Sequence, residues 1–347
     1  MIANDNEPVP LDRPSVRVFM MDWQRNNSQA PAELLLNPLK RFCDFQVATW
    51  DARTNSAMVD TDVANGIRHF VYCHMPPPSW HSWTNGTSVS WLPMWDQVVD
   101  NGPAWWQALP KKVRVVAFSK DVRRSAELAG LECISLRYFP DVGERVVFDD
   151  IGTRRLLYWN RRGLLSPQLL ARLCRELGVT ELIFRRTMDP GADKALEYLP
   201  TGASFPRKVT VIEGSLSRSA WMEQLSRAQL FVAPRALEGV GVTTLEAMAG
   251  GSVVIALDAP TMNEYIEHER TGLFIRKAEG RRRAFNALRT MAGKRRSTYL
   301  ASDEQDLSWA KGIDLNAIGS AAVEQTQKGA KSWRASWASY AEFILAD

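Results

Sequence analysis

Short apolar runs alternate along the chain with longer segments in which apolar positions recur at helical spacing. The short runs predict strands, and the longer segments between them predict helices. This alternation is typical of an α/β protein with parallel sheets. The predicted strands lie at 16–22, 45–51, 69–75, 114–119, 133–139, 154–160, 181–186, 208–213, 229–234 and 252–257, and the predicted helices at 31–42, 120–130, 166–178, 217–228 and from 241 onward.

The pattern is interrupted around residues 141–153, where the sequence becomes polar and loses its periodicity. It restarts with a strand and then a helix, whose start is marked by Ser166 as N-cap and Pro167 at the first helical position. Two successive runs of βα units predict two doubly wound domains, the first covering 1–150. Ligands of such domains bind beyond the carboxyl ends of the strands, so we expect a site in a cleft between the domains.

Composition supports this organisation. The chain has 347 residues, 45% of them hydrophobic and 24% charged, which is enough for two domains. No apolar run reaches the ~18–20 residues of a membrane-spanning helix, and the first residues are polar rather than signal-like, so we expect a cytoplasmic protein.

The four cysteines and four histidines show no metal or disulfide spacing, so no metal is expected. The net charge of +4 agrees with an anionic partner.

The segment 238–251, EGVGVTTLEAMAGG, places glycines and two acids around a predicted helix start near Gly241. A helix start offers free N–H groups and a partial positive charge, and small residues let a phosphate approach the backbone. Carboxylates accept hydrogen bonds from sugar hydroxyls. Glu238 and Glu246 therefore predict a ligand with phosphates in the middle and a sugar at each end, a nucleotide sugar. The alternative is an acid that only stabilises the helix dipole.

The longer stretch 229–275 resembles the donor-binding domain of GT-B glycosyltransferases, in particular the large retaining family-4 type (glycosyl transferases group 1). The two acids, LEAMAGG, VVIALD, NEYI and TGLFI follow that family's order, and a weaker resemblance covers 115–143, 157–178 and 332–347. It implies an α/β GT-B fold, two doubly wound Rossmann-like domains facing across a cleft. In that arrangement 1–150 is the acceptor-side domain, 151–328 binds the nucleotide-sugar donor, and 329–347 is a helix that crosses back to the N-terminal domain.

The resemblance implies catalytic roles for three residues. Glu238 matches the acid that contacts the donor sugar near the reacting carbon, and His74 matches a histidine that binds a sugar hydroxyl or orients the reacting groups. Arg161 matches the basic residue that neutralises the leaving diphosphate. The plainer alternatives are a core histidine with satisfied hydrogen bonds and a solvated surface arginine. Because a guanidinium and a helix start supply positive charge, no metal or other cofactor is implied.

The resemblance also implies how the donor is bound. Glu246 binds the nucleotide ribose, the backbone at the helix start meets the diphosphate, and the base meets the segment around residues 212–216. UDP- or GDP-sugars are the expected donors. The donor-binding residues are then Gly239, Gly241, Val242, Thr243, Glu246, Arg162, Arg185, Ile212, Glu213 and Leu216.

The sequence departs from the family in the phosphate region. A lysine usually follows the arginine of the first donor-domain strand, but NRRGLLSPQ contains none. A diphosphate leaving group needs positive charge that is already in position. Arg162, or Arg185 and Arg186, are therefore expected to replace the lysine.

Acceptor recognition is predicted from two further segments. The family's glycine-rich loop after the first strand is absent, and Asn26, Asn27 and Ser28 are expected to make that turn and to lie near the acceptor. Trp80 and Trp83 follow His74 in a loop-like segment, and tryptophan stacks well on sugars, so acceptor contact is expected there as well. Asn26, Asn27, Trp80 and Trp83 are thus the predicted acceptor residues.

Two features have plainer interpretations. Trp91 and Trp95, four residues apart, are expected to be core residues of one helix. The basic stretch 275–296 carries an apolar stripe at helical spacing and is expected to pack as a surface helix on the donor domain. The alternatives for this helix are contact with anionic lipid or with nucleic acid.

Taken together, the residues and the resemblance predict a metal-independent glycosyltransferase that uses a nucleotide diphosphate sugar as donor. The resemblance further implies retention of configuration and a glycan or lipid-linked acceptor. A cytoplasmic location, with peripheral contact to the cytosolic face of a membrane, fits these partners. One alternative is transfer to a modified base in nucleic acid. Another is a non-catalytic partner protein that kept the fold, motivated by the missing lysine and glycine loop.

Overall fold

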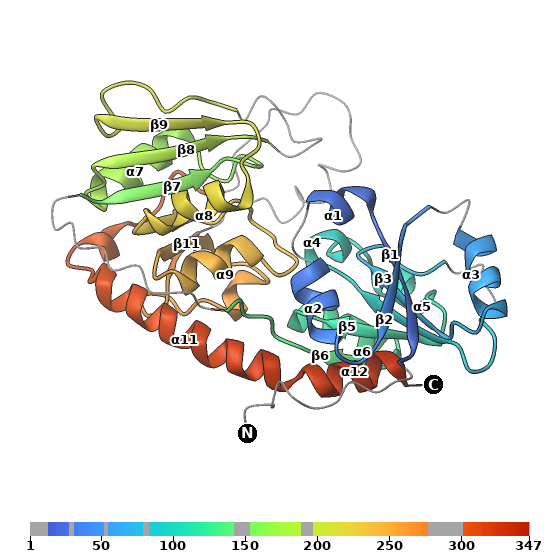
Figure 1. Cartoon of the computed structure of the whole chain (residues 1–347). Helices are drawn as coiled ribbons and strands as arrows, with labels where there is room; N and C mark the ends of the chain where they lie inside the picture. Colours follow the sequence, from blue (N-terminus) through green and yellow to red (C-terminus); the bar gives the residue numbers. More distant parts are fainter. Residues whose placement is uncertain are drawn as a thin grey trace. The chain divides into compact units, whose positions relative to one another are not determined.

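A computed structural model describes residues 13–27, 31–51, 55–78, 83–141, 153–188, 197–276 and 301–346. The chain divides into two compact units, one formed by Met1–Tyr138 with Lys331–Asp347 and the other by Phe139–Ala330. Each unit contains a six-stranded parallel sheet with helices packed beside it (Figure 1), so the α/β class is confirmed. The predicted boundary between residues 150 and 151 lies outside the described residues.

The sheet of the first unit has the strand order β2-β1-β3-β4-β5-β6, and every neighbouring pair is parallel. Its inner strands β3, β4 and β5 are buried along their whole length, as expected when both faces of a parallel sheet are covered. The run at 133–139 is strand only at its start. Strands β1 to β6 are Ser15–Met20, Asp44–Thr49, His69–Cys73, Ser88–Leu92, Val113–Ala117 and Cys133–Ser135.

The helix predicted at 120–130 is α6, Lys120–Leu128. Ser119 caps its start, because the hydroxyl accepts a hydrogen bond from the Val122 amide at 3.3 Å. Gly130 follows its end with φ = 69°, the left-handed conformation that glycine adopts without strain. The other helical segments are α1 (Asp22–Asn27), the π-helix η1 (Ala32–Leu36), α2 (Asn37–Leu39), α3 (Asn55–Ala64), α4 (Trp95–Val98), α5 (Pro103–Gln107) and α12 (Trp337–Leu345).

The prediction that Trp91 and Trp95 share one helix is wrong. Trp91 lies in β4, a strand that the sequence reading missed, whereas Trp95 begins α4. Pro93 lies between them, and proline is excluded from helix interiors because it lacks an N–H donor. The core position predicted for Trp91 is confirmed, since its side chain is fully buried.

The turn predicted at 26–28 also differs from the structure. Strand β1 leads almost directly into α1, which includes Asn26 and Asn27, while Ser28 lies outside the described residues. Gln24 makes this early helix start feasible, because its Oε1 accepts a hydrogen bond from the Met21 amide at 2.8 Å. This side-chain contact is half of a capping box, which the pattern of glycines and asparagines did not reveal.

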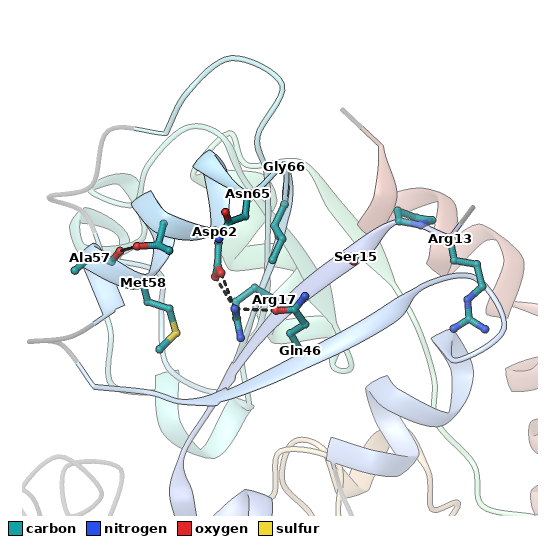
Figure 2. A pocket seen from close by; sticks show the side chains of 12 residues that line it. Arg13, Ser15, Arg17, Gln46, Ala57, Met58, Asp62, Asn65 and Gly66 are labelled. Atoms are coloured by element: carbon teal, nitrogen blue, oxygen red, sulfur yellow. Dashed lines mark hydrogen bonds and ion pairs between the residues drawn. The ribbon is translucent and has the colours of Figure 1, made fainter. Parts of the chain in front are cut away.

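A surface hollow of about 820 Å³ lies in this unit, beside the start of β1 and the end of α3. Figure 2 shows Arg17 and Asp62 pointing toward each other in it. Arg17 donates to both carboxylate oxygens of Asp62, at 2.6 and 2.5 Å, and to Gln46 Oε1 at 2.9 Å. These groups satisfy one another, and they lie near the amino end of β1 rather than at the carboxyl ends, where ligands of such sheets bind.

The second unit repeats the plan with the strand order β12-β11-β10-β7-β8-β9, again parallel throughout. Every strand predicted in this half is present. Ser166 caps α7 as predicted, accepting a hydrogen bond from the Leu169 amide at 3.0 Å. Strands β7 to β12 are Arg155–Trp159, Glu181–Arg186, Lys208–Glu213, Leu230–Val232, Val253–Leu257 and Leu273–Ile275; the helices are α7 (Pro167–Glu176), α8 (Arg218–Ser226), α9 (Val242–Ala249), η3 (Met262–Glu264) and η4 (Ser308–Ala310). The helix α11 (Leu315–Ala335) begins in this unit, and its last residues, from Lys331 on, belong to the first.

The last helix, α12, packs within the first unit. Tyr340 Oη donates to the Leu34 carbonyl at 3.0 Å, and Ser88 Oγ donates to the Ile344 carbonyl at 3.0 Å. Trp333, near the end of α11, contacts the ring of Tyr138 in the same unit. In the parts of the chain that the structure describes, no helix has the length and apolar character needed to cross a bilayer.

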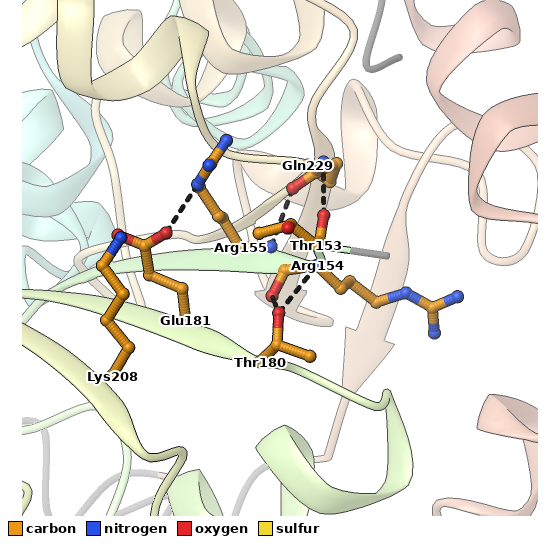
Figure 3. A network of polar contacts seen from close by, with 7 residues as sticks. All are labelled: Thr153, Arg154, Arg155, Thr180, Glu181, Lys208 and Gln229. Carbon is orange, nitrogen blue, oxygen red and sulfur yellow. Dashed lines mark hydrogen bonds and ion pairs between the residues drawn. The ribbon is translucent and has the colours of Figure 1, made fainter. Parts of the chain in front are cut away.

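A buried carboxylate links three neighbouring strands of the second unit (Figure 3). Arg155, Glu181 and Lys208 occupy paired register positions on β7, β8 and β9. Glu181 is 3% exposed and accepts hydrogen bonds from Arg155 Nε at 2.6 Å and from Lys208 Nζ at 3.1 Å. Burial by itself raises the pKa of Glu181, but the two hydrogen bonds and the two positive charges outweigh it, so the pKa lies below its usual value.

Glu181→Gln is expected to lower the free energy of unfolding at neutral pH by about 1–3 kcal/mol, because two cations lose their charged acceptor. A carboxyl with a depressed folded pKa stabilises the protein above its unfolded pKa, and this contribution is lost as pH falls through the folded pKa. The difference between wild type and variant in urea unfolding should therefore shrink toward acid pH. The control is Glu267→Gln, which breaks an exposed pair with Arg270 at 2.5 Å and should cost less than about 1 kcal/mol. Equal losses in both variants would contradict this prediction.

Candidate functional site

The strand order of the second unit brings two loops together. Strands β8 and β9 lie on one side of β7, whereas β10, β11 and β12 lie on the other, so the order reverses between β7 and β10. Because the strands are parallel, the loops that leave β7 and β10 emerge at the same edge of the sheet. Arg161 lies in the first loop and Glu238 in the second. Such a switch point is where ligands of doubly wound sheets bind.

The loop after β10 ends at Gly241, and α9 begins at Val242, as predicted. Gly241 has φ = 73°, and a Cβ atom there would lie 2.5 Å from Met262 Cε. The left-handed backbone favours glycine at this position, whereas the flexible end of the Met262 side chain could move aside. The N-cap residue, Gly241, makes no side-chain cap to α9, and N–H groups at such a helix start favour an anion.

The acid-bearing loop is anchored through the backbone of Glu238. Its carbonyl accepts a hydrogen bond from Thr261 Oγ1 at 2.9 Å, and Thr261 is fully buried. The Glu238 side chain is 8% exposed, and its Cγ lies 3.5 Å from the place of a Cβ on Gly241. The acid is therefore held against the turn that starts α9.

Glu246 has a protein partner that the sequence reading missed. It is 6% exposed, and Arg218 from α8 binds both of its carboxylate oxygens, with Nη1 to Oε2 at 2.8 Å and Nη2 to Oε1. Bidentate pairs of this kind fix the orientation of a carboxylate. No motif marked Arg218, because its only local signal is its place after the Ser217 cap of α8.

The cations and indoles at the ends of β7 and β8 form a cluster. The guanidinium carbon of Arg161 lies 4.3 Å from the ring centroid of Trp159, and that of Arg185 lies 3.8 Å from the same centroid. Trp221 from α8 lies 5.5 Å from Trp159 and 5.2 Å from the Arg185 guanidinium. We call Arg161, Arg185, Trp159 and Trp221 the arginine–indole cluster. Arg162, the other predicted residue of this loop, is exposed.

The two consecutive arginines of β8 differ in their surroundings. Arg186 binds Glu213 at 2.7 Å and approaches Glu197 at 3.6 Å. Arg185 is 8% exposed and donates from Nη2 to the Gly214 carbonyl at 3.4 Å. Burial, and then the charge of Arg161, lower the pKa of Arg185. Arg185 is thus a buried cation whose charged neighbour, Arg161, is also a cation.

His74 lies at the corresponding switch point of the first unit, after β3, where the strand order reverses between β1 and β3. Its φ is 67°, a left-handed value that is uncommon for a residue other than glycine and that turns the chain sharply out of the strand. Its Nδ1 contacts Gln97 Nε2 at 2.9 Å, and its carbonyl accepts a hydrogen bond from Trp91 Nε1 at 3.1 Å. The histidine is therefore well held, and its contact with a sugar stays a prediction.

The remaining predicted residues are distributed as follows. Trp83 packs its ring against Phe70 and Tyr72, at 5.4 and 6.2 Å, so its contact with the acceptor stays a prediction. Trp80 lies outside the described residues, as do 277–296 of the basic stretch. Gly239 is buried, Val242 and Thr243 are partly buried at the start of α9, Ile212 and Glu213 end β9, and Leu216 follows it.

The comparisons with known proteins show which fold the two units form. The two parallel six-stranded sheets with helices packed beside them have the GT-B architecture of solved glycosyltransferase structures. Residues 191–288, which contain Glu238, Glu246 and α9, match the family described as Glycosyl transferases group 1. The resemblance noted at 229–275 and the GT-B fold are therefore confirmed. No curated protein matches the chain by sequence.

Three solved structures show the extent of the likeness. A glycosyltransferase from Rickettsia africae ESF-5 is 12% identical, with a TM-score of 0.60 over 97% of this chain and 100% of its own. WaaG, a glycosyltransferase involved in lipopolysaccharide biosynthesis, is 13% identical, with a TM-score of 0.58 over 96% and 100%. HepE of Anabaena, in complex with UDP and glucose, is 11% identical, with a TM-score of 0.52 over 94% and 100%. At these identities the likeness establishes the fold.

Proposed function

We propose that this protein transfers a sugar from a nucleoside diphosphate sugar, a UDP- or GDP-sugar, to a glycan or lipid-linked acceptor with retention of configuration. The observation that carries the proposal is the loop 238–241, an acid-bearing turn closed by a left-handed glycine at the uncapped start of α9. A helix start favours phosphate, and a neighbouring carboxylate accepts sugar hydroxyls. HepE, which has this fold, was solved with UDP and glucose.

The chemistry assigned to the site is mainly electrostatic. When the bond between sugar and diphosphate breaks, negative charge grows on the diphosphate, and donors already in place stabilise that charge. Arg161 and the first N–H groups of α9 take this role. Glu238 binds the donor sugar near its reacting carbon, His74 binds a sugar hydroxyl, and Glu246 binds the ribose. Since these groups supply the positive charge, we infer that transfer requires no metal ion.

The acceptor is assigned to the first unit. The involvement of WaaG in lipopolysaccharide biosynthesis supports a glycan or lipid-linked acceptor for a chain of this fold. We infer a cytoplasmic location with peripheral contact to a membrane surface, which fits such an acceptor. The nucleic-acid alternative rests on the basic charge and the tryptophans of the sequence, and nothing in the described residues favours it.

A thermal-shift panel of UDP-, GDP- and ADP-sugars, run in excess EDTA, tests the proposal. A ligand at about 100 times its dissociation constant should raise the melting temperature by roughly 5–10 °C, because it binds only the folded state. Release of nucleoside diphosphate from the stabilising donor then distinguishes an enzyme from a non-catalytic partner. No shift with any donor would refute the proposed donor class. A shift or turnover that appears only when a divalent metal is added would refute metal independence.

A further inference from the structure

We propose that Arg185 is the second cation of the diphosphate site and that Trp159 and Trp221 are positioning residues that hold its guanidinium. The inference rests on the proposed function and names the chemistry recognised there, a doubly charged pyrophosphate group. It also decides which residue takes the place of the lysine that is absent after Arg161.

The first observation is a buried charge without a counter-charge. Arg185 is 8% exposed, its Nε is buried with no hydrogen-bond partner in the described structure, and its Nη2 makes only a long contact with the Gly214 carbonyl. The charge that acts on its pKa is a second cation, Arg161. Burying a cation in this way is unfavourable unless an anion completes the site.

Arg186, the next residue along β8, has the carboxylate partners that Arg185 lacks among the described residues. It is neutralised by Glu213 and Glu197. Successive side chains of a strand point to opposite faces, so the two arginines have different surroundings. Of the two arginines that the sequence offered together, the structure assigns the phosphate role to Arg185.

The indoles explain how an uncompensated guanidinium is kept in place. Arg185 lies over the rings of both Trp159 and Trp221, at 3.8 and 5.2 Å from their centroids. Trp159 is itself fixed by a hydrogen bond from Nε1 to the Thr187 carbonyl at 2.8 Å. An indole face attracts a cation without neutralising it, so Arg185 stays fully charged toward a ligand. A lysine lacks the planar group that stacks in this way.

Topology places this cation beside the other phosphate-binding groups. Arg185 lies at the carboxyl end of β8, Arg161 follows β7, and α9 follows β10. These three strands are neighbours in the parallel sheet. All three groups therefore lie at one edge. Arg161 and Arg185 also contact the same ring of Trp159, which keeps the two guanidinium groups near each other.

Calorimetric titration of the full chain with inorganic pyrophosphate, then with UDP, UMP, GDP and GMP, tests the inference. Arg185→Ala should raise the dissociation constant for pyrophosphate about tenfold or more, because a charged hydrogen-bond donor is lost. Arg185→Lys should recover only part of the affinity. Trp221→Leu should weaken binding several-fold, whereas Trp221→Phe, which retains an aromatic face, should stay close to wild type. Arg186→Ala is the matched control and should change the constant less than twofold.

The preference of the protein for nucleoside diphosphates over monophosphates shows whether Arg185 binds the phosphate directly or only supports the structure. Arg185→Ala should reduce the ratio of the two dissociation constants, whereas general loosening weakens both nucleotides alike. The inference is overturned if wild type does not bind pyrophosphate, or if Arg185→Ala and Arg186→Ala have equal effects. If Arg185→Ala binds nucleoside diphosphates as tightly as wild type, this inference fails and the proposed function stands. If pyrophosphate binding depends on Arg185 but no nucleotide or donor binds, the anion site stands and the proposed function fails.

Discussion

Glu238→Ala is expected to lower kcat for sugar transfer about 100-fold or more, with the fold and the affinity for nucleoside diphosphate largely unchanged. The carboxylate is assigned to the donor sugar, whereas Arg161 and the start of α9 hold the diphosphate. The loop keeps its place without the side chain, because the backbone carbonyl of Glu238 is held by Thr261 at 2.9 Å. Steady-state kinetics with the donor found in the thermal-shift panel, combined with titration of the product nucleotide, measures both quantities.

Two further variants sharpen this test. Glu238→Gln preserves the shape and one acceptor oxygen but loses the charge, so its kcat should lie between wild type and alanine. Glu223→Ala removes an exposed carboxylate from α8 of the same unit and should leave turnover unchanged. Near-normal turnover by Glu238→Ala would remove Glu238 from the site.

Arg161→Ala is expected to lower kcat about 100–1,000-fold, because the leaving diphosphate loses a positioned positive charge. The guanidinium lies 4.3 Å from the Trp159 centroid, which orients it at the switch point between β7 and β10. Arg161→Lys should recover part of the rate, since an ammonium keeps the charge but not the planar stacking. Single-turnover kinetics separates this chemical step from product release.

Arg162→Ala is the comparison for this prediction. The sequence offered Arg161 and Arg162 as neighbouring cations, but Arg162 is exposed and Arg161 is partly buried over the indole. Charge at an exposed position is screened by solvent, so Arg162→Ala should change kcat by less than about threefold. A larger loss from Arg162→Ala than from Arg161→Ala would reverse the assignment of the leaving-group cation.

Much of the fold could be predicted because its signals are local. Parallel strands such as β3, β7 and β11 are buried on both faces, so they read as continuous apolar runs bounded by polar turns. Helix starts such as Ser119 and Ser166 are marked by residues that cap their own backbone. The errors arose where the local signal was ambiguous. Strand β4 contains two serines and a tryptophan, and the start of α1 depends on a side-chain contact of Gln24.

Candidate site residues could be predicted where they lie close together in one short segment of the sequence. The segment from Glu238 to Glu246 contains the loop, the left-handed glycine and the helix start, so its sequence alone indicated an anion site flanked by acids. The pair of Glu246 with Arg218 joins residues on α8 and α9 that no local pattern connects. No local pattern connects Trp221 to the arginine–indole cluster either, because it lies on α8, which contains none of the predicted site residues.

By itself, the sequence determined the two βα patterns, the position of the helix start at Gly241 and the order of the acids around it, because backbone conformation and burial of apolar runs are local properties. Only the tertiary structure decided which arginine has a carboxylate partner and which lies uncompensated between indoles. That difference arises from side chains on separate strands and helices, Arg185 and Arg186 being identical in type and adjacent in the chain. Electrostatic surroundings depend on distances across the sheet, and those distances exist only once the strands have paired.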